Sequence, residues 1–346
     1  MPISGVNRVA AWGRLSVQLL FAAAILSAAP RVLAQSGGEA GTFEQAASRL
    51  DQIPHAARHE NYEGVFVYQR GTFVQSSRIA HYAVRDDEYE SLESLDGKPR
   101  TLLRHDDELY TFVPERHLCI VERRQNRDAF PALLSDSGRQ VLAVYEPKLL
   151  GEDRVAGMDA QVIELAPKDP YRFAYKLWTD EKTGLLLRAQ TLDASGQVLE
   201  QIAFTQLRVG VPVRRAPITA GMRNTAGWTL VHPPVVPVDM EAQGWQLNVN
   251  VPGFRKIREL RRPMAAREAS APPIPVDQAV FSDGLSTVSV FVEPTDKNSR
   301  KEGAGVSGAT HVLVTRHGDY WLTLLGEVPQ GTLQLIASSI KFKASN

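Results

Sequence analysis

The sequence predicts a mainly β protein with few helices, of the α+β class. From Tyr62 to about Leu207, short runs that alternate apolar and polar residues recur between turn sequences such as Asp96-Gly97 and Ser195-Gly196. A second series of such runs extends from Trp245 to Gly326. Because side chains alternate between the two faces of a strand, these runs predict two series of antiparallel strands joined by short turns.

A short helix is predicted ahead of the first strand. Thr42 and Gln45 have the spacing of a capping box, in which two side chains satisfy the free N–H groups at a helix start. The apolar residues around and after this box share one stripe of the helix: Phe43, Ala46, Ala47 and Leu50. Pro54 predicts that the helix breaks or kinks there, with a second short turn from His55 to Asn61 leading into the sheet.

The first predicted strand, from Asn61 to Tyr68, has a distinctly aromatic face. Tyr62, Phe66 and Tyr68 point to that face. Gly64 lies among them, and its missing side chain leaves space for something large lying across the strand. A long sheet that is aromatic on one side and covered by one short helix would curl into an open barrel, with the helix across its mouth or lumen. The sequence does not determine how far the barrel closes.

Eight aromatic residues of this first domain can line an apolar cavity for an acyl chain, in which each buried methylene contributes about 0.8 kcal/mol. The other interpretation is an ordinary core packed against the helix. The eight residues are Tyr62, Phe66, Tyr68, Tyr110, Phe112, Tyr171, Phe173 and Tyr175.

The chain divides into an export signal and two domains. Arg8 and Arg14 precede an apolar stretch, and Val32-Leu33-Ala34 has the small residues of a cleavage site, so the start of the chain has the pattern of a signal peptide. The predicted segments are the signal peptide at 1–34, the first domain at 35–210, a Pro- and Gly-containing linker at 211–227 and the second domain at 228–346. We expect a soluble periplasmic product, since no later segment approaches the roughly 18 apolar residues of a membrane helix.

Two further features concern the second domain. Four apolar residues near its end follow helical spacing and predict a helix that packs on the second sheet: Leu333, Ile336, Ala337 and Ile340. The stretch from Asp296 to Gly305 is predicted to be a polar loop.

Charge and cysteine content exclude several classes of protein. The chain has 39 Lys and Arg against 39 Asp and Glu, and residues 1–34 carry three arginines and no acid, so the exported part is slightly acidic. A general nucleic-acid binder needs a basic surplus, which this chain lacks. Cys119 is the only cysteine, which excludes an intramolecular disulfide, and its apolar neighbours predict a buried strand residue.

No motif predicts a cofactor, a metal ion or a catalytic centre. Residues 303–308 satisfy G-x-G-x-x-G, but they follow a polar loop and lead into a strand, whereas a dinucleotide site needs a turn from strand to helix. His55 and His59 share a helix face without the glutamate of H-E-x-x-H or a third ligand. Two acidic runs are predicted to be solvated turns: Asp86-Asp87-Glu88 and Asp106-Asp107-Glu108. We therefore expect a protein that is not an enzyme.

A basic cluster in the second domain is a candidate partner-binding surface. Arg255, Arg258 and Arg261 lie in one predicted strand, and Arg214 and Arg215 lie in the linker. The planar guanidinium group donates two parallel hydrogen bonds to a carboxylate or a phosphate. An acidic peptide and a lipid headgroup both fit this chemistry, in a groove between the domains. The alternative is a solvated strand face.

Several segments resemble the RseB/MucB family of periplasmic regulators. They are Asn61 to Tyr68, Leu95-Asp96-Gly97-Lys98-Pro99-Arg100, Phe281-Ser282-Asp283-Gly284-Leu285 with Ser289-Val290-Phe291, and Gly326-Glu327-Val328-Pro329. The resemblance covers nearly the whole mature chain. It implies an N-terminal half-barrel like that of the lipoprotein carriers LolA and LolB, followed by a smaller antiparallel sheet with a helix.

The resemblance also implies a function. Members of the family bind the periplasmic tail of a transmembrane anti-sigma factor and shield it from the site-1 protease. They release the tail when lipid or lipopolysaccharide signals envelope damage, and so act as negative regulators of the envelope stress response. The aromatic residues would then bind the lipid and the arginines the tail, with no cofactor and no nucleic acid involved. A homo-oligomer is left open.

The alternative function is a lipid or lipoprotein carrier of the LolA type, in which the first domain does the work. The second domain and the linker count against it, because such a carrier needs only the half-barrel. A hydrolase is a third interpretation, for which scattered Ser, His and Asp residues provide no motif.

Overall fold

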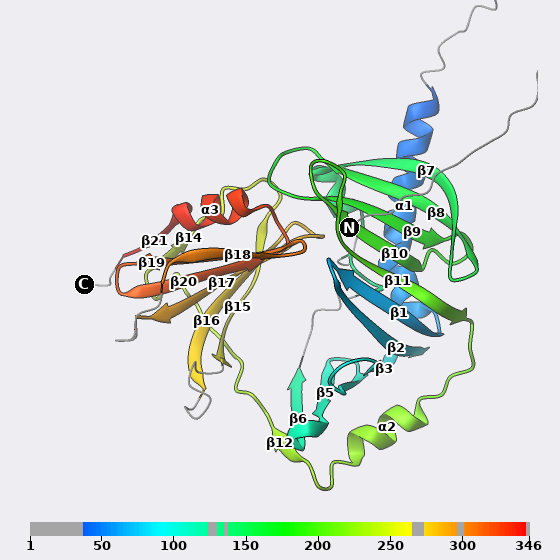
Figure 1. The fold of residues 1–346 in the computed structure, drawn as a ribbon, viewed down its shortest axis with the longest axis horizontal. Coiled ribbons are helices and arrows are strands. Elements are labelled where there is room, and N and C mark those ends of the chain that lie inside the picture. Colours follow the sequence, from blue (N-terminus) through cyan, green and yellow to red (C-terminus); the bar gives the residue numbers. More distant parts are fainter. Residues whose placement is uncertain (1–36, 124–129, 135–137, 265–272, 296–300, 344–346) are drawn as a thin grey trace, which may run out of the picture. The chain divides into compact units, whose positions relative to one another are not determined.

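The structure, a computed structural model, describes residues 37–123, 130–134, 138–264, 273–295 and 301–343 (Figure 1). From Gly38 onward the chain belongs to one compact unit. The predicted signal peptide at 1–34 lies outside the described residues. None of the described helices is both long enough and apolar enough to cross a membrane.

Twelve strands form one large sheet in the first two thirds of the chain (Figure 1). They are β1 (Tyr62–Arg70), β2 (Phe73–Val84), β3 (Asp87–Ser94), β4 (Thr101–His105), β5 (Glu108–Val113), β6 (Leu118–Arg123), β7 (Tyr145–Val155), β8 (Met158–Pro167), β9 (Ala174–Asp180), β10 (Leu186–Leu192), β11 (Val198–Val209) and β12 (Thr229–Val231). Their order in the sheet is β12-β6-β5-β4-β3-β2-β1-β11-β10-β9-β8-β7, so the two end strands do not pair with each other. All neighbours are antiparallel except β12 and β6. A short 3-10 turn, η1 (Pro114–Arg116), joins β5 to β6.

One long helix, α1 (Gly37–His59), packs on this sheet (Figure 1). It starts before Thr42, so the predicted capping box does not mark its first turn, and it continues through Pro54. Its buried residues are Ala46, Ala47, Leu50, Ile53, Pro54, Ala56 and Ala57, whereas Phe43 is exposed. The predicted break at Pro54 is wrong, because burial of this apolar stripe outweighs the cost of about 3 kcal/mol for a proline inside a helix.

Pro54 also explains why another segment of the chain can lie very close to α1. Proline has no N–H to donate, so the carbonyl of Leu50, four residues earlier, loses its partner within the helix. Gly138, the first residue of the 3-10 helix η2 (Gly138–Ala143), lies on that carbonyl. A Cβ on Gly138 would collide with the Leu50 oxygen and lie 2.8 Å from the nitrogen of Asp51. Only glycine lets η2 approach the helix this closely.

The space beside Gly64 is filled from a neighbouring strand. A Cβ on Gly64 would lie 2.9 Å from the ring of Phe204 and 2.6 Å from the carbonyl oxygen of Gln206, both on β11. A β-bulge between Val65 and Phe66 shifts the register at the same place. The large group that lies across Gly64 is therefore an aromatic side chain of the sheet itself.

A short helix occupies part of the stretch predicted to be a linker. α2 (Ala216–Arg223) buries Ile218 in a cluster that also contains Leu103 and Phe112. Trp228 packs edge-on against Phe112, with ring centres 5.0 Å apart. The sequence pattern did not reveal this helix because only one of its residues is fully buried. The stretch is thus docked on the first sheet through a small apolar cluster.

The rest of the chain forms a seven-stranded antiparallel sheet and a two-stranded one. The larger sheet contains β13 (Val236–Pro237), β15 (Arg255–Met264), β16 (Ile274–Ser282), β17 (Thr287–Pro294), β18 (Gly303–Ser307), β19 (Thr310–His317) and β20 (Tyr320–Gly326), in the order β13-β15-β16-β17-β20-β19-β18. β14 (Trp245–Leu247) pairs with β21 (Ile340–Phe342). The predicted helix, α3 (Gln330–Ser339), packs on the larger sheet through Leu333 and Ile336.

Two strands of this sheet, the two-residue β13 and β18, lie outside the strands that the sequence predicts. β18 lies partly within the stretch predicted to be a polar loop, and glycine-rich composition gives no strand signal. Its pairing with β19 runs from Gly303 opposite Val314 to Ser307 opposite Thr310. The G-x-G-x-x-G match is therefore a strand and its following turn.

The predicted fold class is confirmed: the chain is mainly β, with a large N-terminal sheet, a smaller C-terminal sheet and few helices. Cys119 is fully buried in β6, as predicted, and burial raises the pKa of its thiol.

The contact at Gly138 makes a testable prediction about stability. Gly138→Ala should destabilise the protein by about 1–3 kcal/mol, because overpacking forces the backbone of η2 away from α1. Urea unfolding followed by tryptophan fluorescence measures the change. Gly331→Ala is the control, since a Cβ on this residue of α3 meets nothing within 4 Å. Equal shifts of the two unfolding midpoints would contradict the explanation.

Candidate functional site

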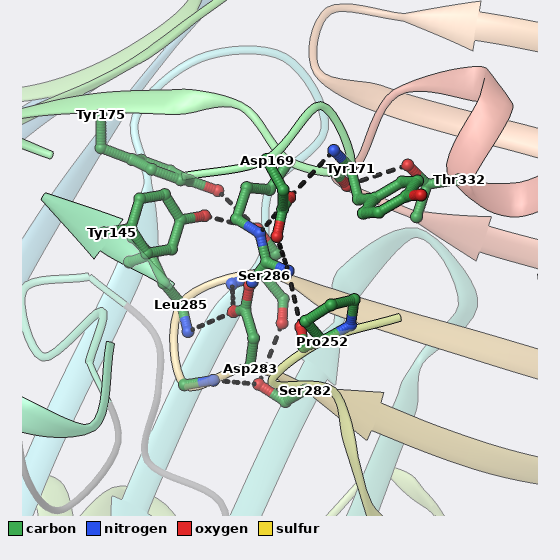
Figure 2. A network of polar contacts seen from close by, with 12 residues as sticks. Tyr145, Asp169, Tyr171, Tyr175, Pro252, Ser282, Asp283, Leu285, Ser286 and Thr332 are labelled. Atoms are coloured by element: carbon green, nitrogen blue, oxygen red, sulfur yellow. Dashed lines mark hydrogen bonds and ion pairs between the residues drawn. The ribbon is translucent and has the colours of Figure 1, made fainter. Parts of the chain in front are cut away.

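The turn between β16 and β17 reaches into the hydrophobic core of the N-terminal sheet (Figure 2). Leu285, in this turn, is 8% exposed and belongs to the cluster that contains Leu50, Ile163 and Leu177. Gly284 precedes it with a φ of 99°, which glycine adopts without strain. The C-terminal sheet therefore contributes a side chain to the core of the N-terminal sheet.

A buried guanidinium holds this turn in place. The side chain of Arg172, in the connection between β8 and β9, is 0% exposed. Its Nε and Nη2 donate to the two carboxylate oxygens of Asp169, each at 3.0 Å. Its Nη1 donates to Asp283 at 2.6 Å, and Nη2 also donates to the carbonyl of Pro252 at 2.6 Å. One side chain thus bonds to its own loop, to the turn after β16 and to the segment before β15.

Asp283 is satisfied on both carboxylate oxygens although its side chain is also 0% exposed. Oδ2 accepts the hydrogen bond from Arg172, and Oδ1 accepts the backbone N–H groups of Leu285 at 3.0 Å and Ser286 at 2.7 Å. Burial raises the pKa of Asp283, and the backbone donors and Arg172 oppose that rise. The same carboxylate therefore shapes the turn and pairs with the guanidinium.

Aromatic side chains enclose the ion pair. The hydroxyl oxygens of Tyr145 and Tyr175 lie 3.4 Å and 3.2 Å from Oγ of Ser286. Burial raises the pKa of both tyrosines, so both hydroxyl groups stay protonated. The rings of Tyr145 and Phe254 lie 5.7 Å and 5.4 Å from the guanidinium carbon of Arg172. The pair is therefore shielded from water by rings that also attract the cation.

Two more contacts join the same parts of the chain. Thr332 of α3 donates its hydroxyl to the carbonyl of Tyr171 at 2.9 Å (Figure 2). The ring of His311 on β19 stacks on Phe173, with ring centres 5.9 Å apart. The loop that carries Arg172 is thus contacted on both sides by the C-terminal sheet and its helix.

The buried ion pair between Arg172 and Asp283 fixes how the turn and the loop lie against each other, and it contributes little net stability. Moving two charges out of water costs several kcal/mol per ion, which their attraction and hydrogen bonds roughly offset. Removing one partner leaves the other charge buried and unpaired, at a cost of about 3–5 kcal/mol. Among the described side chains of this site there is no nucleophile next to a base. Chemically, the site can hold two elements together or release them.

The eight aromatic residues predicted to bind lipid do not gather around one cavity. Tyr62 and Phe66 pack with Phe204 in the cluster below α1, and Tyr175 lies in the adjacent cluster. The others have different neighbours: Tyr110 and Phe112 pack with α2, Tyr171 contacts the core of the C-terminal sheet, Phe173 stacks on His311, and Tyr68 donates to Glu200 at 2.9 Å. Five of the eight are buried: Tyr62, Phe66, Phe112, Phe173 and Tyr175. Lipid binding by this set stays a prediction.

A cavity of about 440 Å³ lies between β1, β2, β11 and the turn after β7. Its lining is mixed, with apolar Ile79 and Leu207 beside charged Glu63, Arg78 and Arg208. None of the eight predicted aromatic residues lines it.

The three predicted partner-binding arginines are divided between the faces of β15. The bulge at Ile257 adds one residue to the strand, so Arg255 and Arg258 lie on the same face although they are three positions apart. Arg261 lies on the other face. Arg261 makes a two-pronged ion pair with Asp277, at 2.6 Å and 2.8 Å. Arg255 donates to Gln140 at 2.8 Å, whereas the side chain of Arg258, exposed on β15, makes no hydrogen bond or ion pair with any described residue. Arg258 is thus the arginine most available to a partner.

The two acidic turns lie against each other, because the pairing of β3 with β4 brings them to the same end of the sheet. Glu88 is 8% exposed, with Nη1 of Arg104 at 3.4 Å from its carboxylate, so the prediction of a solvated turn is wrong for this residue. Asp106 accepts the N–H of Glu88 at 2.9 Å. Asp87, His105 and Asp106 could offer three metal ligands within 4.8 Å of one another, the one such group in the described part of the chain.

Arg172 and Asp283 are not among the site residues that the sequence predicts. Asp283 lies in a segment that carried the family resemblance, and Arg172 lies between two aromatic residues, Tyr171 and Phe173. An arginine in such an apolar setting is a signal that its charge is buried with a partner. The partner is 111 residues away, so no local pattern identifies it.

Comparison with known proteins covers both parts of the chain. Residues 45–222 match the MucB/RseB N-terminal domain, and residues 239–341 match the MucB/RseB C-terminal domain. The chain is 30% identical over 305 residues to the sigma factor AlgU regulatory protein MucB of Pseudomonas aeruginosa, covering 86% of this chain and 90% of that protein. It is 28% identical over 298 residues to the sigma-E factor regulatory protein RseB of Haemophilus influenzae, covering 85% of this chain and 90% of that protein.

Solved structures of MucB share this fold. The complex of Pseudomonas aeruginosa MucA/MucB matches with a TM-score of 0.69 and 29% identity, over 87% of this chain and 100% of that one. MucB in complex with MucA(peri) matches with a TM-score of 0.67 and 28% identity, over the same shares. Both sequence relatives are named as regulatory proteins. The chain therefore belongs to the MucB/RseB family and is a non-enzymatic regulator of the sigma-E/AlgU type.

Proposed function

We propose that this protein acts in the periplasm as a negative regulator of the envelope stress response. It binds the periplasmic tail of a transmembrane anti-sigma factor, keeps that tail away from the site-1 protease and releases it when lipid or lipopolysaccharide binds. The observation that carries this proposal is the match to MucB in complex with MucA(peri), which extends over both sheets of this chain.

Protection of the tail follows from simple competition. A protease must take an extended segment into its own active site, so a segment held by another protein is cleaved only when it is released. A ligand that drives the tail from almost fully bound to almost fully free must favour the releasing form by about 5.5 kcal/mol. An acyl chain contributes about 0.8 kcal/mol per buried methylene, so one lipid provides enough free energy.

The buried ion pair supports a route for this coupling. Lipid entering the N-terminal core would meet the cluster that contains Leu285 and Tyr175, and both are attached to the Arg172–Asp283 site. A shift of this cluster would disturb the turn between β16 and β17, and with it the C-terminal sheet. Interlocked cores of this kind switch between discrete arrangements and do not deform gradually.

The same interlocking counts against a carrier of the LolA type. A carrier needs one sheet with a lipid cavity, whereas here the hairpin of the C-terminal sheet completes the core of the N-terminal sheet. A second sheet held this tightly is better explained as the part that responds to lipid.

The first prediction concerns release of the tail. Cleavage of the anti-sigma tail by the site-1 protease should slow in the presence of the protein and recover when lipopolysaccharide is added.

Phe130 packs on Phe66 and Phe204, with ring centres 5.3 Å and 5.0 Å away. Phe130→Ala should lower the lipopolysaccharide concentration for half-release about threefold or more, because less protein contact has to be displaced.

Phe43→Ala is the matched control, because this phenylalanine is exposed on α1. Titration of cleavage rate against lipopolysaccharide measures both variants. A tail that is cleaved equally fast with and without the protein would refute the proposed function.

The second prediction concerns the coupling route. Asp283→Asn keeps the shape of the side chain but leaves Arg172 with less compensating charge, so it should destabilise the protein by about 3 kcal/mol. It should also weaken the effect of lipopolysaccharide on tail release, while tail binding without lipid stays close to normal. Asp159→Asn, at an exposed aspartate, is the control for both the unfolding and the release measurements. An unchanged lipid response in Asp283→Asn would exclude this route.

The third prediction concerns the arginines of β15. Arg258→Glu should weaken tail binding about tenfold at low salt and less at high salt, because an exposed charge acts through screened attraction. Arg261→Glu is a poorer test, since it would also leave Asp277 next to a like charge. Lys98→Glu makes the same change of charge at an exposed site in the loop between β3 and β4. If Arg258→Glu and Lys98→Glu bind the tail equally well at both salt concentrations, Arg258 lies outside the interface.

A further inference from the structure

The edges of the two large sheets differ in how they are protected. A free edge strand exposes N–H and C=O groups that can pair with another strand, and proteins block this with charges, prolines, bulges or very short strands. β7 has a bulge between Leu149 and Gly151 and charged residues along its length. β12 and β13 contain only three and two residues, and β15 beside β13 has a bulge at Ile257 and basic side chains. Three of the four edges are therefore protected.

β18, the fourth edge, has none of these features. Its five residues include no charge and no proline, and its pairing with β19 runs without a bulge. All five are exposed, and Val306, at 68%, is the most exposed large apolar side chain among the described residues. The start of the strand is anchored, because the carboxylate of Glu302 accepts the N–H of Arg316 at 2.6 Å. No described strand pairs with its outer edge, so within the described part of the chain a strand about 17 Å long presents an open row of backbone groups.

Exposed apolar side chains lie next to the end of this strand. Gly308, in the turn after β18, rests on the side chain of Arg70 at the end of β1, where a Cβ would lie 2.6 Å from Cδ of Arg70. Phe73 pairs with Arg70 across the β1–β2 hairpin and is 48% exposed, and Val74 beside it is 53% exposed. Each partner of that contact therefore has exposed apolar residues near it in the chain: Val306 is two residues before Gly308, and Phe73 and Val74 lie beside Arg70.

We propose that the free edge of β18 is the docking strand for an extended segment of the anti-sigma tail. This inference rests on the proposed function and names one part of the protein that holds the tail. The segment would add an eighth strand to the C-terminal sheet, with main-chain hydrogen bonds providing affinity and side chains against Val306 and Phe73 providing specificity. Because β18 has no charged residue and exposes Val306, we expect it to bind an uncharged segment with β-branched or aromatic residues at alternate positions.

A second copy of the chain fits this edge less well than a single segment. The turn after β18 already rests on Arg70 of the same chain, so pairing two β18 strands would also bring two N-terminal sheets alongside each other. One extended segment needs only the width of a single strand, about 4.8 Å. Gly303 and Gly305 leave room for the larger side chains of the segment on one face of β18.

The test uses the mature chain and the periplasmic domain of the MucA counterpart from the same organism, with affinity measured by calorimetry and backbone protection by amide hydrogen exchange. Binding should slow exchange at residues 303–307. Val306→Lys should weaken binding at least tenfold, because a charge on an edge strand opposes its pairing with an apolar segment. Val306→Thr should bind within about twofold of the wild-type protein, since it keeps the β-branched shape.

Leu150→Lys is the matched control, because it adds the same charge at a 41% exposed leucine on the protected edge β7, and its affinity should be unchanged. Normal tail binding with no protection at 303–307 and no loss in Val306→Lys would overturn the docking strand and leave the proposed function intact. A wild-type protein that does not bind the tail would overturn both. Protection at 303–307 that rises with the concentration of this chain alone would assign the edge to a second copy, and so overturn the proposal.

Discussion

The burial of the Arg172 guanidinium is the constraint on which the arrangement of the two sheets depends. A charge that is fully removed from water must be paired and hydrogen-bonded, and Arg172 finds its partners in Asp169, Asp283 and the carbonyl of Pro252. Two of these partners come from the C-terminal part of the chain. The folded core of the N-terminal sheet is therefore complete only when the β16–β17 turn is in place.

This constraint changes how the two sheets can be related to function. Two domains joined only by a linker would move independently, and an event in one would have little effect on the other. Here Leu285 belongs to the core of the first sheet while its neighbours Asp283 and Ser286 belong to the turn of the second. A ligand that acts on the first core has a physical connection to the second sheet. That connection is what the proposed release of the tail by lipid would require.

The backbone accommodates this fold at a few positions where side chains would not fit. Gly138 lets η2 lie on the helix carbonyl that Pro54 leaves free, and Gly64 makes room for the ring of Phe204. In β18, by contrast, Gly303 and Gly305 leave two positions of an edge strand without a side chain. The same residue type thus allows close packing inside the N-terminal sheet and an open surface on the C-terminal sheet.

The sequence by itself determined the fold class, the run of antiparallel strands, the final helix and the burial of Cys119, because these depend on local periodicity and turn chemistry. It also determined the family, since the segments that carry the resemblance lie along both parts of the chain. Only the tertiary structure decided that α1 continues through Pro54, that β18 is a strand, and that the predicted arginines divide between two faces of β15. It also decided that the eight aromatic residues separate into different clusters. The pairing of Arg172 with Asp283 joins residues 111 positions apart, and local patterns contain no information about contacts at that separation. Burial energy and long-range pairing outweigh local preference at each of these positions, which is the physical reason that the sequence alone could not place them.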